Sequence, residues 1–310
     1  MRILKAKHMG WCFGVRDAVA LVEREAATGP VTVLGELVHN ETVNAELRQR
    51  GVRIVGSGSA SAAAEAVGDG GTGSRSATII ITAHGASEKM IEHVRQQAPR
   101  VVEATCPLVR SAHQAVCELA VAGYYPVIVG QRDHVEVRGL IGDLAEFSVV
   151  LAVDDVRLLP SRCRYGVVAQ TTQPLDRVRQ LVELIRQRFP EAEVRLVDTV
   201  CLPTKQRQAA AVELARQCDV VVVIGGRHSN NTRELAATCA QHCLRVERVE
   251  TAADLQWSWF HSDDTVGITA GTSTPDSVIA VVEHWLRELA EEFAKGGANV
   301  LPATVPSLSR

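Results

Sequence analysis

Short runs of β-branched and apolar residues alternate along the chain with longer stretches in which apolar residues recur at helical spacing. The strand-like runs include VTVLG, IIIT, YYPVIVG, VVLAV, GVVAQ, VVVVIGG and VGITAG. This alternation is typical of α/β proteins, in which helices cover a mostly parallel sheet. We therefore predict an α/β fold with parallel strands.

Three cysteines reveal a longer period in the pattern. Cys106 follows Cys12 by 94 residues, and Cys201 follows Cys106 by 95. Each comes after a strand-like run (RILKA, RVVEAT and VRLVDTV) and opens a helix-like segment. The period predicts three pseudo-symmetric α/β domains with small, mostly parallel sheets around a central site. Their expected bounds are 13–105, 106–200 and 201–310, the last completed by an N-terminal strand within 1–12.

Two segments do not fit the period. Residues 56–77 are rich in Gly, Ser and Ala, so we expect a surface loop or a weak helix there. Residues 298–310 follow the last helix-like stretch and are expected to form a tail or an arm.

Polar side chains recur at two further points of each repeat, where strand-like runs end. The first point, 27 or 28 residues after each cysteine, carries His39, His134 and the pair His228 and Ser229. The second carries His84, the pair Thr171 and Thr172, and the pair Thr272 and Ser273. Ligands of parallel α/β sheets bind beyond the carboxyl ends of the strands. We therefore expect the cysteines and these polar turns to surround one site.

The three cysteines are expected to bind a metal. A thiolate at a helix N-terminus is stabilised by the helix dipole, and three soft ligands suit iron–sulfur or zinc. A four-iron cluster with three protein thiolates leaves one iron open, whereas zinc on three cysteines gives a hydrolytic Lewis acid. A non-enzymatic redox sensor is a third alternative. Five other cysteines lack this context and are expected to pack structurally: Cys117, Cys163, Cys218, Cys239 and Cys243.

Composition narrows the function classes. The formal net charge of −3 gives no basic field, so we expect no nucleic-acid partner. The sequence shows neither a signal peptide nor an apolar run of membrane-spanning length, so we expect a soluble cytoplasmic protein. Neither GxxxxGK[ST] nor a GxGxxG after a strand occurs, which disfavours a bound nucleotide. Electrons for a reduction would therefore come from another protein.

The polar turns favour a phosphorylated substrate. Histidine N–H groups donate to phosphate, and hydroxyl and amide groups at helix N-termini also bind anions. The candidate phosphate-binding residues are His39, His84, His134, Ser229, Asn231 and Ser273. Glu136, two residues after His134, is the one carboxylate placed among these features, so it is the candidate proton donor.

Nine segments together resemble the family of 4-hydroxy-3-methylbut-2-enyl diphosphate reductases, iron–sulfur enzymes of the methylerythritol phosphate route to isoprenoids. In chain order they are GWCFGV, LVHNETV, AHGAS, EATCPLV, DHVEVRGLIG, QTT, TVCLPTKQRQ, RHSNNTREL and TAGTSTPD, spanning about residues 10–280. The resemblance implies one [4Fe–4S] cluster held by Cys12, Cys106 and Cys201, with one iron open to the substrate hydroxyl. It also implies reductive removal of that hydroxyl to give isopentenyl and dimethylallyl diphosphates.

The resemblance further implies roles for individual residues. Glu136 would deliver protons, with Thr171 in the relay and His134 beside them. The diphosphate would contact His39, His84, His134, Thr171, Ser229, Asn230, Asn231 and Ser273. Asn230 stands where the family commonly has a second serine, Val135 where proline often follows the histidine, and residues 202–206 replace a commoner aromatic-containing run. A ferredoxin or flavodoxin is the implied electron donor, and we expect a monomer or a homodimer.

Overall fold

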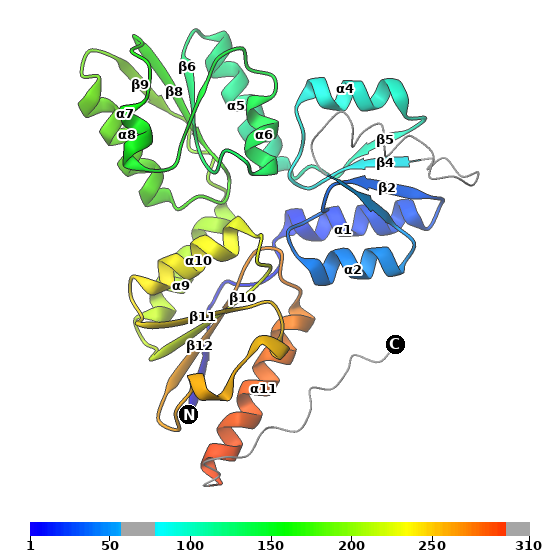
Figure 1. Ribbon diagram of the computed structural model, residues 1–310, viewed down its shortest axis with the longest axis vertical. Coiled ribbons are helices and arrows are strands. Elements are labelled where there is room, and N and C mark those ends of the chain that lie inside the picture. Colours follow the sequence, from blue (N-terminus) through cyan, green and yellow to red (C-terminus); the bar gives the residue numbers. More distant parts are fainter. Residues whose placement is uncertain (57–77, 296–310) are drawn as a thin grey trace. The chain divides into compact units, whose positions relative to one another are not determined.

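The computed structural model describes residues 1–56 and 78–295 (Figure 1). Residues 57–77 of the Gly/Ser-rich segment and the whole C-terminal segment 298–310 lie outside the described residues. The loop and the tail predicted there are therefore untested.

The described strands form three four-stranded sheets, and every strand pair in them is parallel. Helices follow most of the strands, as expected for α/β layers. The predicted fold class, with small parallel sheets repeated three times along the chain, is confirmed.

The first sheet has the strand order β3-β2-β4-β5. Its strands are β2 (Val31–Leu34), β3 (Arg53–Val55), β4 (Thr78–Ile81) and β5 (Val101–Glu103), and its helices are α1 (Phe13–Ala26), α2 (Glu41–Gln49) and α4 (Glu88–Gln97). The central strand β4 reads TIII and is buried along its whole length. Such an uninterrupted apolar run is typical of a parallel strand covered by helices on both faces.

The second sheet has the order β7-β6-β8-β9. Its strands are β6 (Tyr125–Val129), β7 (Ser148–Val150), β8 (Arg164–Ala169) and β9 (Glu193–Leu196), and its helices are α5 (Pro107–Val121), α6 (Val135–Ile141), α7 (Val153–Arg157) and α8 (Leu175–Arg188). Both central strands are almost wholly buried, β6 along its full length.

The third sheet takes one strand from the start of the chain and three from its last third, in the order β1-β12-β10-β11. Its strands are β1 (Arg2–Lys5), β10 (Val220–Ile224), β11 (Arg245–Val249) and β12 (Thr265–Ala270). Its helices are α9 (Leu202–Ala215), α10 (Asn230–Ala240) and α11 (Asp276–Ala294), with short 3-10 turns η1 (Ala252–Asp254) and η2 (Trp257–Trp259).

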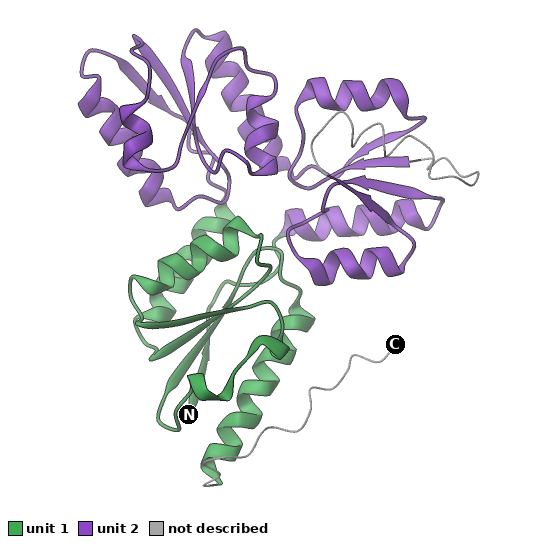
Figure 2. Ribbon diagram, viewed as in Figure 1, with its two compact units in different colours: residues 1–12, 202–310 green, residues 13–201 purple. Residues whose placement is uncertain are grey.

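The chain divides into two compact units (Figure 2). Unit 1 contains residues 1–12 and 202–310 and carries the third sheet. Unit 2 contains residues 13–201 and carries the first and second sheets. The finer three-domain division, with a boundary at residues 105 and 106, stays a prediction.

Candidate active site

Each of the three repeat cysteines directly precedes the first residue of a helix: α1, α5 or α9. Their backbone N–H groups also make equivalent hydrogen bonds. Cys106 donates to the carbonyl of Ala83 at 3.1 Å and Cys201 to that of Thr171 at 3.0 Å, both within unit 2. Cys12 donates to the carbonyl of Thr272 at 3.1 Å within unit 1. Each acceptor lies two residues beyond a central strand, so the fold repeats one hydrogen bond three times.

The sulfur of Cys106 occupies space left by a glycine. A Cβ atom added to Gly14, in the first turn of α1, would lie 2.4 Å from Cys106 Sγ. Such a contact is far inside van der Waals distance, so any side chain at position 14 would displace the thiol. Cys106 is only partly buried and forms no disulfide. Sequence reasoning missed Gly14, although a glycine inside a helix-like stretch is a signal of close approach.

Three of the remaining five cysteines pack in unit 1 away from these junctions. Cys239 and Cys243 are buried in an apolar cluster, and Cys218 packs against it. Burial raises the pKa of Cys239 to about 12 and that of Cys218 to about 11, so both carry protons at neutral pH. Protonated thiols of this kind are apolar packing groups rather than metal ligands.

Three histidines from loops of unit 2 form a compact group that we call the histidine triad. His39 follows β2, His84 follows β4, and His134 caps α6 with its Nδ1, which accepts from the Glu136 N–H at 3.1 Å. The His39 and His84 rings stack with centroids 4.1 Å apart. The His134 ring meets them edge-on, at 4.9 Å from His39 and 5.7 Å from His84. The triad therefore joins the loops of two different sheets.

The electrostatics of the triad favour an anion. Burial lowers the pKa of His84 well below its ordinary value, and the neighbouring His39 and His134 lower it further. The buried Nδ1 of His84 has no hydrogen-bond partner among the described residues. Positive charge on one imidazole disfavours protonation of its neighbours, and the negative charge of a bound phosphate would offset that repulsion.

Glu136 lies in the first turn of α6 and is 2% exposed. Its Oε1 accepts a hydrogen bond from the backbone N–H of Thr171 at 2.6 Å. Burial raises the pKa of Glu136 to about 7, although hydrogen bonds from the Thr171 backbone and side chain act in the opposite direction. A carboxyl group with that pKa carries a proton for part of the time at neutral pH, as a general acid must.

The polar loops of unit 1 carry the other predicted residues. Ser229 caps α10, with its Oγ accepting from the Thr232 N–H at 3.3 Å. The Oδ1 of Asn231 accepts from the Thr272 N–H at 2.9 Å, which joins the loop after β10 to the loop after β12. The Nδ2 of Asn231 is buried without a hydrogen-bond partner among the described residues, so it is an available donor.

Asn230 and Ser273 lie in the same pair of loops. Asn230 Oδ1 accepts from Arg233 in the first turns of α10. The indole N–H of Trp11, next to Cys12, donates to the backbone carbonyl of Ser273 at 3.2 Å. The loop with Cys12 and the loop with Ser273 are therefore tied within unit 1.

Thr232 is a buried residue that sequence reasoning missed. Both Gly225 and Gly271, in the loops after β10 and β12, approach it so closely that a Cβ on either would lie 2.3 Å from Thr232 Oγ1. Gly225 also has a φ of +153°, which side chains rarely tolerate. Because neither glycine has a side chain, both loops pack closely against the start of α10.

The predicted residues thus form two groups, one in each unit. His39, His84, His134, Glu136 and Thr171 converge in unit 2, whereas Ser229, Asn230, Asn231 and Ser273 share the paired loops of unit 1. Among the residues that the structure describes, no group of three or more His, Cys, Asp or Glu side chains is arranged to hold a single metal ion. The prediction that all three cysteines face one centre concerns both units and stays a prediction.

Comparison with known proteins decides the family. The sequence profile of the LytB protein family matches residues 3–287, almost the whole chain. The chain belongs to the LytB protein family. The resemblance inferred from the nine sequence motifs is confirmed. Within 1–56 and 78–295, no helix of this LytB chain is both long and apolar enough to span a membrane.

Two relatives of this LytB chain share one enzyme name. The 4-hydroxy-3-methylbut-2-enyl diphosphate reductase of Trichlorobacter lovleyi is 38% identical over 292 residues, which cover 93% of this chain and 99% of the relative. The enzyme of the same name from Aquifex aeolicus is 35% identical over 295 residues, covering 93% and 97%. The family profile, over residues 3–287, includes all nine sequence motifs.

Solved structures agree with the fold. A structure of (E)-4-hydroxy-3-methyl-but-2-enyl diphosphate reductase, described as the terminal enzyme of the non-mevalonate pathway, is 35% identical, covers 93% of this chain and 100% of its own, and has a TM-score of 0.63. The E-1-hydroxy-2-methyl-but-2-enyl-4-diphosphate reductase from Plasmodium falciparum is 24% identical, covers 99% and 95%, and has a TM-score of 0.80. At that identity the second structure supports the LytB fold alone.

Proposed function

We propose that this chain is a 4-hydroxy-3-methylbut-2-enyl diphosphate reductase. The substrate takes up two electrons and two protons, its allylic C–O bond breaks, and a C–H bond forms. Isopentenyl or dimethylallyl diphosphate and water leave. The observation that carries the proposal is the buried Glu136, with its pKa raised to about 7, beside the histidine triad, in which two rings stack and the third meets them edge-on. The reaction requires an acid that protonates the departing hydroxyl and a group that binds the diphosphate anion.

The donor residues fit a [4Fe–4S] cluster held by Cys12, Cys106 and Cys201. Three thiols at helix N-termini suit soft iron, and Gly14 leaves space at the Cys106 sulfur. The absence of a single-ion group among the described residues is compatible with this, because cluster thiolates bind different iron atoms. When bound, the cluster supplies electrons and an iron without a protein thiolate, open to the substrate oxygen.

We assign diphosphate binding to the histidine triad of unit 2 and to uncharged polar residues of unit 1. His39, His84 and His134 donate N–H groups, and the negative charge of the substrate offsets the electrostatic cost of protonating crowded rings. Ser229, Asn230, Asn231 and Ser273 donate hydroxyl or amide groups from the other unit, at the N-terminus of α10 or beside it. Buried donors without internal partners, on His84 and Asn231, support this assignment.

Glu136 is assigned as the proton donor to the departing hydroxyl. Its raised pKa keeps the proton on the carboxyl group near neutral pH. Once the proton has left, the Thr171 N–H stabilises the carboxylate that remains. The hydroxyl of Thr171 also hydrogen-bonds to Glu136, which supports a role for Thr171 in the proton relay.

The partners and the compartment follow from the same proposal. The electrons come from a ferredoxin or a flavodoxin, the electron donor that the family resemblance implies. We assign the protein to the cytoplasm, as a monomer or a homodimer, in keeping with its cysteine content and its balanced charge.

Metal analysis and turnover test the proposal together. Anaerobically purified protein should be brown, with about four irons and four sulfides per chain. It should consume the allylic diphosphate with a reduced viologen as electron source. A colourless protein that binds one zinc, or a brown one without turnover, would contradict the proposal. Cys106→Ser should lose the iron, whereas Cys117→Ser, on the same helix α5, serves as the matched control and should keep it.

A further inference from the structure

A single carboxylate joins the two sheets of unit 2 close to the histidine triad. Asp143 directly follows the C-cap of α6, and its two oxygens face the N-terminus of α4. Its Oδ2 accepts from the Glu88 N–H at 2.7 Å, and its Oδ1 accepts from the Lys89 N–H at 3.1 Å. Carboxylates at a helix N-terminus satisfy free N–H groups and complement the helix dipole. The first turn of α4 is therefore capped from another sheet.

A third helix contacts the same carboxylate. The Nε2 of His113, on α5, lies 3.1 Å from Asp143 Oδ2, and both side chains are mostly buried, at 15% and 14% exposed. Lys89 also reaches back and donates from Nζ to the Gly142 carbonyl at 3.4 Å. Asp143 thus connects α4, which belongs to the first sheet, with α5 and α6 of the second.

Small residues let the helices approach closely at this point. A Cβ on Gly142 would lie 2.6 Å from the Cβ of Ser87, and one on Gly139 would lie 3.5 Å from Ala86 Cα. Position 142 therefore admits no side chain unless Ser87, the N-cap of α4, moves. We call the contact of residues 139–143, at the end of α6, with residues 86–89, at the start of α4, the α4–α6 junction.

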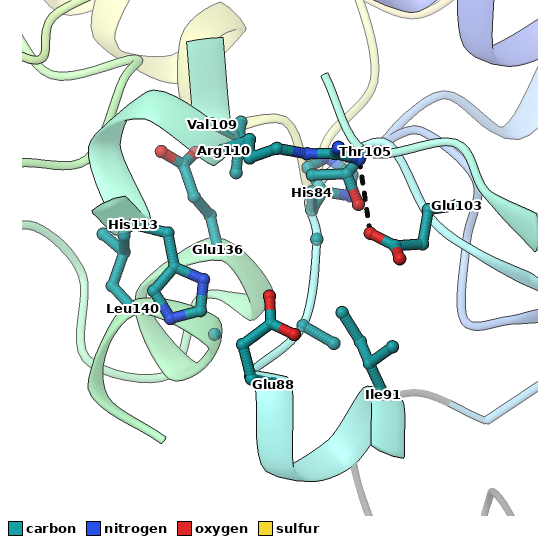
Figure 3. A pocket seen from close by; sticks show the side chains of 13 residues that line it. His84, Glu88, Ile91, Glu103, Thr105, Val109, Arg110, His113, Glu136 and Leu140 are labelled. Carbon is teal, nitrogen blue, oxygen red and sulfur yellow. Dashed lines mark hydrogen bonds and ion pairs between the residues drawn. The ribbon is translucent and has the colours of Figure 1, made fainter. Parts of the chain in front are cut away.

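A cavity lies beside the junction and is lined by groups from both sheets (Figure 3). Charged or polar lining residues include Glu88, Glu103, Arg110 and His113, and Arg110 donates to Glu103 at 3.3 Å across one side. His84 and Glu136 also line it. Ala86, Glu88 and Gly139 of the junction therefore line the same cavity as His84 and Glu136.

Both helices at the junction begin at candidate active-site loops. α4 starts four residues after His84, and α6 starts directly after His134 with Glu136 in its first turn. We propose that Asp143 is a positioning residue, which fixes the loop of His84 against the loop of His134 and Glu136. The spacing of the triad then depends on a carboxylate that does not touch the substrate. Its effect on turnover rests on the proposed function, whereas its effect on the rings does not.

Histidine-selective NMR on the oxidised protein tests the geometry without turnover. We expect Asp143→Asn to shift the ring resonances of His84 and His134, since the amide offers one acceptor in place of two and no charge for His113. Asp155→Asn is the matched control, because Asp155 accepts from Leu151 and Ala152 N–H groups at 2.7 and 2.8 Å and caps α7. The control should lower the melting temperature similarly while leaving those resonances unchanged. Identical spectra for both variants would overturn the proposal.

Kinetics provide the second readout. For Asp143→Asn, kcat/KM should fall about 10- to 100-fold, because misplacing a binding group by about 1 Å can cost 10²-fold. Asp155→Asn should retain wild-type kcat/KM, and equal losses in both variants would count against the positioning role. If Asp143→Asn does not fold, His113→Ala keeps the α4 cap and should produce a smaller shift of the same resonances; no shift would refute the role. Shifted resonances in a protein whose wild type lacks turnover would sink the proposed function and leave the positioning role standing.

Discussion

Two equivalent positions, one in each unit, differ by a single functional group. Glu136 and Asn231 are both the second residue of a helix that follows a central strand, α6 in unit 2 and α10 in unit 1. Each accepts one backbone hydrogen bond from a threonine two residues beyond the neighbouring strand, Thr171 at 2.6 Å or Thr272 at 2.9 Å. Those threonines in turn receive the N–H of Cys201 and of Cys12. The backbone arrangement is the same, and the side chain is a carboxyl group in one unit and an amide in the other.

The difference separates two tasks. A buried carboxyl group can hold and release a proton, and the burial of Glu136 moves its pKa to where that is useful. A buried amide does not titrate, but it offers two N–H donors to an anion without adding charge. The comparison supports the proposal that one repeated backbone frame serves proton chemistry in unit 2 and uncharged anion recognition in unit 1.

The largest expected effect comes from exchanging the carboxyl group of unit 2 for an amide. Glu136→Gln keeps the shape and the Thr171 hydrogen bond but carries no transferable proton, so kcat should fall about 10²- to 10⁴-fold. Iron content and affinity for inorganic pyrophosphate should stay as in the wild type. Single-turnover rates measure the loss of turnover, and titration calorimetry measures the affinity for pyrophosphate. A near-normal kcat in this variant would show that Glu136 is not the proton donor.

The reciprocal exchange in unit 1 should act on binding. Asn231→Asp buries a carboxylate in place of an uncharged buried donor, and the carboxylate repels a diphosphate. We expect KM to rise about 10- to 100-fold, the range for losing a buried hydrogen bond to a charged group, with a smaller change in kcat. Steady-state kinetics decide the matter. A fall confined to kcat would mean that the two positions share a task after all.

The pH dependence should follow Glu136 alone. The acid is active when protonated, and its pKa is raised to about 7, so protonated enzyme predominates below that pH and is lost above it. With a reduced viologen in excess, kcat/KM should decline about tenfold per pH unit on the alkaline side. The residual rate of Glu136→Gln should lack this limb. An alkaline limb that survives in the variant belongs to another group.

The smallest effect should come from the threonines beside the two positions. The Thr171 hydroxyl lowers the pKa of Glu136 by hydrogen bonding to it, so Thr171→Val should raise that pKa further. The alkaline limb of the profile should then move upward by a fraction of a pH unit. Thr272→Val is the matched control in unit 1 and should leave the limb in place, since Asn231 has no proton to lose. Equal shifts in both variants would contradict the comparison.

The sequence predicted the repeated fold because its central strands are uninterrupted apolar runs and its cysteines keep the period. The strand-like runs named from the sequence omit β3 and β11. Both are edge strands with charged residues, Arg53 in one and Arg245, Glu247 and Arg248 in the other. Exposed edges are held by pairing with a neighbour rather than by their own apolar pattern, so a local reading underestimates them.

The sequence predicted the residue types of the candidate site, but not their contacts or pKa shifts. Histidines in strand-end loops could be expected near phosphate, but the pKa of His84 is lowered first by burial and then by His39 and His134, which approach it from loops far apart in sequence. Gly14 and Asp143 matter through partners about 90 and 55 residues away, Cys106 and Glu88. No local sequence pattern predicts such contacts, because they depend on how helices pack against one another.

The three cysteine N–H hydrogen bonds bear on how the enzyme is assembled. They use backbone atoms only, so they form without iron and hold the position of each thiol-bearing residue within its own unit. The proposed cluster would therefore be inserted into chain segments that already hold these hydrogen bonds. After oxidative loss of the proposed cluster, the same segments would keep their form, and repair would require new iron and sulfide rather than refolding of the chain.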